Sequence, residues 1–292
     1  MTEKKTSFLS ANEKLDFIKN KYNQYINDRN CVYDLLIDEW LIIMRNVFET
    51  KQNDNDQYVQ YRVTKNNESR TGVFDPRYAV FRADILQVCA IINVDTLETS
   101  EDICTDDNDN YYDEELVYER GKYIKSDFFD SEISNVRSGG IYYYKNIERA
   151  FLQRRRVVIG FTGRLMRWYD DGRKRAEETF IDGKREGAWS EWSPNGIRCI
   201  EEVYLHGEEN GTWSCWYENK KIAWTKEYTD NGKRYKFISW YEDSGEKESE
   251  GMCIINERNC LDHKQDGLWT YWDTDRNKTT EYYVNGKKQN IK

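Results

Sequence analysis

Apolar residues at helical spacing open the chain. They recur every three or four positions, at Leu15, Ile18, Tyr22 and Ile26. This spacing places them on one face of a helix. Ser10 precedes the stretch and Glu13 follows three residues later, which is the arrangement of a capping box. We therefore expect one amphipathic helix over residues 11–28.

Two apolar runs follow that lack this spacing. Residues 33–48 read YDLLIDEWLIIMRNVF and are apolar on both faces, a pattern that fits a buried helix or a buried strand equally well. Residues 78–92 read YAVFRADILQVCAII. Their richness in β-branched and aromatic residues predicts a core strand.

Extended segments and a short helix complete the first half. Residues 115–133 predict a strand, a turn at Gly121 and a second extended segment. Residues 138–156 read SGGIYYYKNIERAFLQRRR, so we expect two glycines, a tyrosine-rich strand and a short helix. These elements together predict a small α+β domain over residues 1–150.

An acidic stretch over residues 101–115 resembles a calcium loop in composition only. An EF-hand loop that began at Asp106 would need Gly at its sixth position and Glu at its twelfth. Those positions hold Tyr111 and Val117. We therefore expect a solvated loop.

The second half contains a repeat of 24 residues. Tryptophan recurs in step, at Trp168, Trp192, Trp216 and Trp240. A bulky apolar residue lies three positions earlier in each copy, at Leu165, Trp189, Trp213 and Phe237. A fifth copy begins at Gly267, and eight extra residues around CIINERNCLDH place Trp272 32 residues after Trp240. A fixed period of this kind predicts an array of stacked units.

Each unit reads as two strands and two tight turns. Asn-Gly and Asp-Gly pairs supply the positive φ that such turns require. They occur at Asp171-Gly172, Asp182-Gly183, Asn231-Gly232 and Asn285-Gly286. We expect residues 160–292 to form one antiparallel sheet of about five hairpins, so the fold class is α+β with an all-β repeat array.

The two aromatic positions of a repeat should lie on opposite faces of the sheet. Residues three apart on a regular strand point in opposite directions, so Trp213 shares a face with Cys215, and Trp216 lies on the other. A single-layer sheet cannot easily bury both aromatic rows. We expect one row to contact a partner; in the alternative interpretation both rows only hold the repeats together. The candidate interaction surface comprises Trp168, Tyr169, Trp192, Trp216, Tyr217, Trp240, Tyr241 and Trp272.

Composition separates the two halves in the same way. Nine of the ten tryptophans follow residue 160, and thirteen of the seventeen glycines follow residue 150. A chain of 292 residues can form two domains, each with its own core. We expect a boundary between residues 150 and 160.

The charge of the chain indicates which class of partner it binds, and its cysteine content indicates in which compartment it resides. The 44 basic and 53 acidic residues give a net charge of −9, which disfavours nucleic acid because no basic footprint is present to displace counterions. Seven cysteines without a CxxC pair indicate reduced thiols in the cytoplasm. No apolar segment near residue 1 suggests a signal peptide, and none is long enough to span a bilayer.

Candidate catalytic and metal-binding residues are few. Of the two histidines, His206 occupies a turn position of its repeat. His263 lies in the inserted segment, which we expect to be a loop. It follows Cys253 and Cys260 at a spacing that offers three zinc ligands and lacks a fourth. No glycine-rich phosphate loop occurs. We therefore expect no enzyme activity, no cofactor and no metal.

The repeat pattern G-x-W-x-x-W-Y-x-N-G followed by E-x-x-Y-x-N-G-K resembles the MORN repeat variant of bacterial proteins described as antitoxin components. The resemblance covers residues 160–292. It implies a scaffold that binds a protein partner or a membrane surface. The acidic balance of the chain disfavours anionic lipid, because adsorption there depends on basic clusters.

The strings FRADILQV, YERGKYIKSDFFDSEI and SGGIYYY resemble an uncharacterised domain of mimivirus-type giant DNA viruses, where it often precedes such repeats. That domain commonly has Cys and His where this chain has Arg137 and Tyr142, so any role of that pair would be lost here. The resemblance implies no known activity. For a viral protein it implies the host cytoplasm or the virion.

One enzyme resemblance concerns the string SGGIYYYKNIERAF. It is similar to the G-x-G-I-Y-F strand and following helix of poly(ADP-ribose) polymerase-type ADP-ribosyltransferases, which implies that Tyr142 or Tyr143 stacks on nicotinamide. That family also needs a His on an earlier strand, and no His precedes His206. The alternative to an interaction protein is thus a degenerate transferase fold with little or no activity.

Overall fold

The computed structural model describes residues 9–36, 39–52, 58–105, 116–153, 160–229, 233–256 and 259–290. The chain divides into two compact units. Unit 1 comprises residues 1–158 and 165–174, and unit 2 comprises residues 159–164 and 175–292. The first turn of the repeat region therefore packs with the N-terminal part of the chain.

The predicted N-terminal helix is divided in two. Helix α1 spans Ala11–Lys21 and α2 spans Asn23–Ile26, and Tyr22 between them leaves the helical conformation with φ −110° and ψ 26°. The capping box is confirmed. The Glu13 amide donates to Ser10 Oγ at 3.3 Å and the Ser10 amide donates to Glu13 Oε2 at 2.8 Å.

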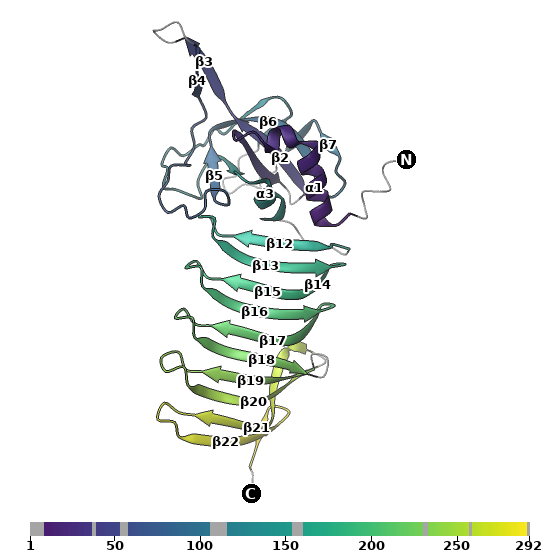
Figure 1. Ribbon diagram of the computed structural model, residues 1–292, viewed down its shortest axis with the longest axis vertical. Coiled ribbons are helices and arrows are strands. Elements are labelled where there is room, and N and C mark those ends of the chain that lie inside the picture. The colour runs from purple at the N-terminus through teal and green to yellow at the C-terminus, as the bar shows by residue number, and fades with distance from the viewer. Residues whose placement is uncertain are drawn as a thin grey trace. The chain divides into compact units, whose positions relative to one another are not determined.

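Unit 1 contains a seven-stranded antiparallel sheet with strand order β10-β6-β2-β1-β11-β5, in which β7 also pairs with β6. Its strands are β1 (Cys31–Leu36), β2 (Trp40–Asn46), β5 (Val80–Ala83), β6 (Ile85–Asn93), β7 (Thr99–Ser100), β10 (Tyr123–Lys125) and β11 (Ile141–Tyr144). Two smaller sheets pair β3 (Phe48–Gln52) with β4 (Tyr58–Arg62) and β8 (Asp102–Cys104) with β9 (Val117–Glu119). Helix α3 (Ile147–Gln153) follows β11 (Figure 1).

The ambiguous run at residues 33–48 is strand rather than helix. It contributes to β1 and β2, which pair as a hairpin with Tyr33 opposite Ile43. Every residue of β1 is buried. Both faces of this strand are therefore covered, which explains why its sequence shows no alternation.

The predicted core strand at residues 78–92 is two strands, separated at Asp84. The turn at Gly121 is confirmed by a φ of +82°. The strands on either side of that turn pair with different neighbours, β9 with β8 and β10 with β6. Most of the expected acidic loop, residues 106–115, lies outside the described residues.

The C-terminal region confirms the predicted antiparallel sheet. Its twelve-stranded sheet runs in chain order as β12-β13-β15-β16-β17-β18-β19-β20-β21-β22-β23, with β14 paired to β13 (Figure 1). The strands are β12 (Gly163–Trp168), β13 (Lys174–Ile181), β14 (Lys184–Arg185), β15 (Gly187–Trp192), β16 (Arg198–Leu205), β17 (Glu208–Trp216), β18 (Ile222–Thr229), β19 (Arg234–Trp240), β20 (Lys247–Asn256), β21 (Asn259–Trp272), β22 (Lys278–Val284) and β23 (Lys287–Gln289). No helix occurs among its described residues.

Tight turns lie at the predicted positions. Asp182, His206 and Asn285 have φ values of 51°, 55° and 49°, and a glycine with positive φ follows each. His206 is thus a turn residue, as its repeat position predicts. The pair Asn231-Gly232 lies outside the described residues.

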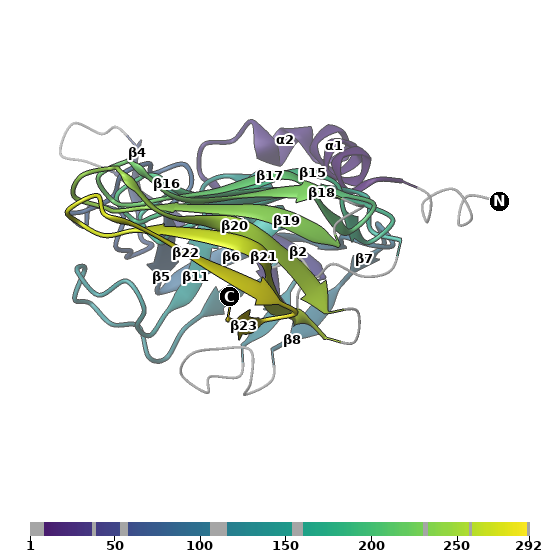
Figure 2. The same cartoon turned by 90° about the horizontal axis from the view of Figure 1, so that it is seen from below.

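The described residues of the insertion lengthen a hairpin and do not form the predicted loop; residues 257–258 lie outside the described residues. Strands β20 and β21 remain paired from Ser249↔Tyr271 to Asn256↔Asn259. This long pair bends away from the plane of the shorter strands (Figure 2). His263 therefore lies on strand β21 and not in a loop, and its ring packs edge-on against Tyr235 with centroids 5.6 Å apart.

Candidate functional site

Four residues of the predicted surface form a row that we name the tryptophan row. It consists of the tryptophans that end β15, β17, β19 and β21, namely Trp192, Trp216, Trp240 and Trp272. All four are half-buried. They occur on every second strand, so neighbours in the row are separated by roughly 10 Å across the sheet. In the first three, the strand register shifts at the tryptophan itself, a change that redirects side chains.

Trp168 differs from the equivalent tryptophans of later repeats. It is 5% exposed and stacks on Tyr78 with ring centroids 5.1 Å apart, while the Arg149 guanidinium lies 5.3 Å from its ring. The expectation that Trp168 belongs to an open interaction surface is therefore wrong, because residues of the N-terminal sequence cover it. Tyr169, the next residue, is half-buried.

The turn that follows Trp168 is held within unit 1 in the same way. The Arg70 guanidinium donates to the Asp170 carbonyl at 2.8 Å and Arg137 pairs with the Asp170 carboxylate. A Cβ on Gly172 would lie 2.1 Å from the Asp75 carbonyl oxygen. This turn requires glycine both for close packing and for its φ of +91°.

The tyrosines of the predicted surface connect successive repeats. The Tyr217 hydroxyl donates to the Trp240 carbonyl at 2.8 Å, and the Tyr241 hydroxyl donates to the Trp272 carbonyl at 2.7 Å. Each bond joins one repeat to the next. Both tyrosines are half-buried, so their rings also lie at the surface beside the tryptophan row.

A second group of rings, which we name the aromatic cluster, forms the packed core of unit 2. Its buried members are Tyr204, Trp213, Tyr228, Tyr235, Cys253 and Trp269, with Trp189, Trp224, Phe237, Ile255, Tyr271 and Tyr283 packed against them. Successive ring centroids from Tyr204 through Trp213 to Tyr228 are 5.2 and 4.9 Å apart. The tryptophan row lies outside this cluster, so the two aromatic positions of a repeat have different environments.

Hydrogen bonds orient the indoles of the cluster. Trp213 Nε1 donates to the Val203 carbonyl and Trp269 Nε1 to the Met252 carbonyl, each at 2.9 Å. Trp189 Nε1 is buried and has no acceptor among the described residues. The hydrogen bonds of Trp213 and Trp269 fix their rings against the neighbouring strand, as a structural core requires.

Charged side chains also pack on the cluster. Lys226 Nζ lies 5.2 to 5.5 Å from the ring centroids of Trp213, Trp224 and Tyr235. The Glu202 carboxylate accepts a hydrogen bond of 2.5 Å from the Tyr204 hydroxyl. Burial raises the pKa of Glu202, although that hydrogen bond acts in the opposite direction.

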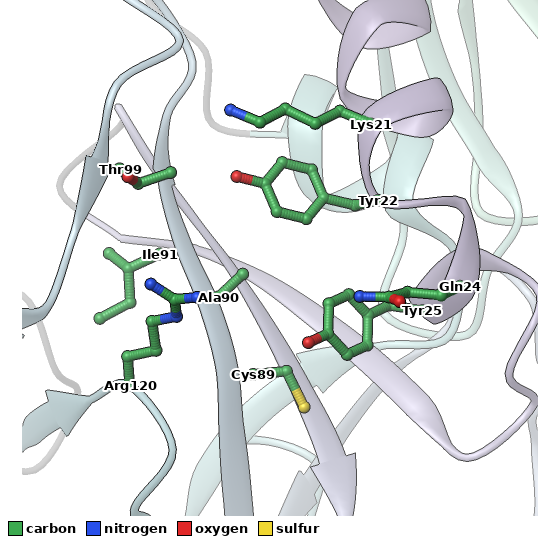
Figure 3. Close-up of a pocket in the computed structure, with 9 residues that line it drawn as sticks. All are labelled: Lys21, Tyr22, Gln24, Tyr25, Cys89, Ala90, Ile91, Thr99 and Arg120. Carbon is green, nitrogen blue, oxygen red and sulfur yellow. The ribbon is translucent and has the colours of Figure 1, made fainter.

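Unit 1 contains a pocket of about 280 Å³. One wall comes from the end of α1 and from α2, and the other from β6, β7 and the β9–β10 turn (Figure 3). The lining residues are Lys21, Tyr22, Gln24, Tyr25, Cys89, Ala90, Ile91, Thr99 and Arg120. The pocket thus combines two tyrosine rings and two cations with residues of strand β6.

The thiol in this pocket belongs to Cys89. Its hydrogen bond with the Cys31 thiol, together with burial, raises the pKa of Cys89. A thiol that keeps its proton is a poor nucleophile.

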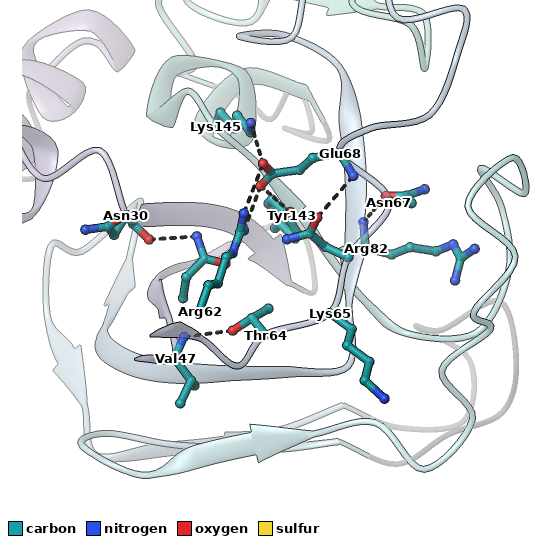
Figure 4. Close-up of polar contacts among 12 residues, drawn as sticks. Asn30, Val47, Arg62, Thr64, Lys65, Asn67, Glu68, Arg82, Tyr143 and Lys145 are labelled. Carbon is teal, nitrogen blue, oxygen red and sulfur yellow. Dashed lines mark hydrogen bonds and ion pairs between the residues drawn. The ribbon is translucent and has the colours of Figure 1, made fainter. Parts of the chain in front are cut away.

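A carboxylate network connects distant segments of unit 1 (Figure 4). Glu68 accepts hydrogen bonds from Arg62 at 3.0 and 3.3 Å, from Lys145 Nζ at 2.8 Å and from the Tyr143 hydroxyl at 2.7 Å. Burial alone would raise the pKa of Glu68, but these hydrogen bonds overcome it and lower the pKa to about 2. Glu68 is therefore a fixed anion that holds β4 and β11 together.

The string that resembles a transferase strand is engaged in packing. Tyr143 is fully buried with its hydroxyl on Glu68, so its ring is not available to stack on nicotinamide. Tyr142 is half-buried, lies 5.6 Å from the Arg137 guanidinium and donates to the Ser138 carbonyl at 2.7 Å. A Cβ on Gly139 would lie 1.8 Å from the Phe128 carbonyl oxygen. Close packing of the backbone therefore explains why this position holds glycine.

The residues considered for zinc do not form a ligand set in the described part of the chain. No group of three or more His, Cys, Asp or Glu residues there is placed to hold a metal ion. Cys253 is buried within the aromatic cluster, where burial raises the pKa of its thiol. The side chain of Cys260 lies outside the described residues.

The pocket of unit 1 was not evident from the sequence. Tyr22 falls on the apolar face of the predicted helix, and Arg120 lies about a hundred positions away along the sequence. The only local signal is the pair Tyr22 and Tyr25 beside Lys21 at a helix end.

Comparisons with known proteins give no family for this chain. No protein-family model matches it, and no curated protein matches it at a significant level. No described helix is long and apolar enough to cross a membrane.

Proposed function

We propose that this is a non-enzymatic interaction protein whose MORN-type repeat array binds a protein partner through the tryptophan row. The observation that carries this proposal is the partial exposure of one tryptophan per repeat at four successive positions. Tryptophan and tyrosine are the residues most often found at the energetic centre of protein interfaces.

The repeats are held together by contacts other than those of the tryptophan row. The aromatic cluster packs each strand against the next, and the Tyr217 and Tyr241 hydroxyls connect the repeats at the turn side. The row lies outside that cluster and retains exposed ring area. This division favours binding over a purely structural role for the row.

Charges around the row favour a protein over a membrane. Arg198 lies over the ring of Trp192, and Lys247 and Lys278 lie over the ring of Trp272, at 5.7 to 5.9 Å. Exposed acids follow the aromatic residues in the adjacent turns, at Glu218, Glu242 and Asp273. Aromatic residues surrounded by charges of both signs are typical of protein interfaces, whereas these acids would repel anionic lipid.

The cysteines favour a reducing compartment. All six cysteines whose side chains are described are free thiols. Free thiols persist where glutathione and thioredoxin keep them reduced. The cytoplasm is therefore the proposed location.

Replacing two central members of the row tests the proposal. Trp216→Ser together with Trp240→Ser should remove at least nine-tenths of the specific partner recovered by the tagged full-length chain from its native cell, because each loss at an interface centre costs about 2 kcal/mol or more. Circular dichroism should show an unchanged sheet.

A matched control is available at the other end of the strands. Ile181→Ser with Leu205→Ser replaces two apolar residues that are 53% and 47% exposed and lie outside the row. This control should retain the partner. Recovery of the same partner by the tryptophan variant, or its loss only in the control, would contradict the proposal.

A further inference from the structure

The pocket of unit 1 has a binding chemistry that the repeat array does not use. Lys21 is exposed, and its Nζ lies 5.4 Å from the ring of Tyr22. Among the described residues no carboxylate forms an ion pair with it. Arg120 supplies a second cation and has one exposed partner, Glu101, at 3.0 Å. The two cations therefore outnumber the acids that face the pocket, although the whole chain is acidic.

The ion pair of Arg120 does not prevent it from binding another anion. Its side chain is 52% exposed and that of Glu101 is 78% exposed. Exposed pairs of this kind contribute little, because water screens both charges. The guanidinium has five N–H donors, and those not directed to Glu101 remain for an anion inside the pocket.

The helical wall offers a flat aromatic surface. Tyr22 and Tyr25 stack with centroids 6.5 Å apart and an interplanar angle of 25°. Both rings point into the pocket (Figure 3). Strand β6 lines the pocket with Cys89 and Ala90, and with Ile91, whose side chain belongs to the buried core. A planar ring placed here would contact aromatic and aliphatic groups, and Gln24 and Thr99 would supply hydrogen bonds at its edge.

Volume limits the size of the occupant. Sites for drug-sized ligands measure about 300–1,000 Å³, and this pocket measures about 280 Å³. A ring with one anionic group fits this space. A dinucleotide does not.

We propose that this pocket binds a small aromatic anion of the size of a nucleoside monophosphate. Its ring lies against Tyr22 and Tyr25. Its phosphate or carboxylate interacts with Lys21 and Arg120. The Cys89 thiol, which keeps its proton, forms part of the lining and takes no part in a reaction.

Ligand-observed NMR and calorimetry with the full chain test the proposal. The probes are adenosine, guanosine, cytidine and uridine 5′-monophosphates, with adenosine and inorganic phosphate as partial ligands. At least one monophosphate should bind at least tenfold more tightly than either partial ligand. Raising the salt concentration should weaken binding, because an anion is held by exposed cations.

Variants locate the site. Lys21→Gln with Arg120→Gln should weaken monophosphate binding at least tenfold, and Tyr22→Ala should weaken it about fivefold, whereas Tyr22→Phe keeps the ring and the affinity. Lys122→Gln is the matched control, because Lys122 pairs with Glu119 at 3.2 Å on the same turn and does not line the pocket.

Three results would overturn the proposal. These are absence of binding at 10 mM for all four monophosphates, equal affinity for inorganic phosphate, and unchanged affinity in the Lys21 and Arg120 double variant. Equal binding of phosphate alone would mean that the rings contribute nothing. Circular dichroism of each variant ensures that lost binding is not lost folding.

Discussion

A single carboxylate shows how unit 1 depends on charge. The side chain of Glu68 is 18% exposed, and three donors lower its pKa from an ordinary 4.5 to about 2. Because the folded pKa is depressed, the ionised carboxylate stabilises the fold fully above about pH 4.5. This contribution is lost as the pH falls toward 2. The shift corresponds to about 3 kcal/mol.

Replacing this carboxylate should change both stability and its pH dependence. Glu68→Gln should lower the free energy of unfolding at pH 7 by about 2–4 kcal/mol, because Arg62 and Lys145 lose their anion. The deficit relative to the natural protein should shrink between pH 4.5 and 2, where Glu68 itself becomes protonated. Urea denaturation at several pH values measures this. A deficit that is constant over that range would contradict it.

Two examples show which features of single residues can be predicted from the sequence and which cannot. Ser10 and Glu13 are three positions apart, so the capping box is visible locally. The burial of Trp168 depends on Tyr78, 90 positions earlier. No periodicity within the repeats distinguishes this tryptophan from Trp192, because the difference arises from the chain outside the array.

At the scale of the hairpin, one glycine carries a steric requirement. Gly251 lies on β20, and a Cβ built there would meet the ring of Trp269 at 2.3 Å. Trp269 therefore packs directly on the backbone of the neighbouring strand. Its Nε1 then reaches the Met252 carbonyl.

Filling this space should destabilise unit 2. Gly251→Ala should lower the free energy of unfolding by about 1–3 kcal/mol, the usual effect of overpacking. Combining it with Trp269→Leu removes the opposing ring, so the double variant should be less destabilised than the sum of the two single changes. Denaturant titrations of all four proteins measure the coupling. Strict additivity would show that the ring is not the cause.

Hairpin prediction succeeded where the signal was local. Asn-Gly and Asp-Gly pairs identified the turns at Asp182 and Asn285, because positive φ restricts residue choice. The sequence predicts a loop at the segment inserted around CIINERNCLDH. Pairing with its own return strand made it β20 and β21 instead. The sequence does not predict the pocket in unit 1, because the walls of the pocket come from four separated segments.

At the scale of the whole molecule, the described strands of the repeats form their ladders with adjacent strands. The sheet order from β15 to β23 follows the chain order, and the buried aromatic cluster extends across it. Stability in such arrays is approximately a sum of repeat and interface contributions. Unit 2 should therefore tolerate the loss of one complete repeat.

Deleting residues 205–228 tests this at constant register, because it joins Tyr204 to Thr229 and removes 24 residues. The shortened chain should remain folded with a sheet spectrum and a lower melting temperature. Deleting 23 residues, 205–227, should unfold or aggregate the array, since a one-residue slip exchanges the two faces of every later strand. Equal behaviour of the two deletions would contradict a repeat-based core.

The same strand order determines how the array would respond to tension. Along the described part of the sheet, each strand from β16 to β22 forms its backbone ladders with the strands immediately before and after it in the chain. A pull across the strands would break one ladder at a time, beginning with β23, which is held by three residue pairs. The array would therefore lengthen stepwise and at low force. A sheet pulled along its strands would resist more strongly, because all the hydrogen bonds between two strands would have to break together. After release each strand would find its partner beside it in sequence, so recoil would be fast.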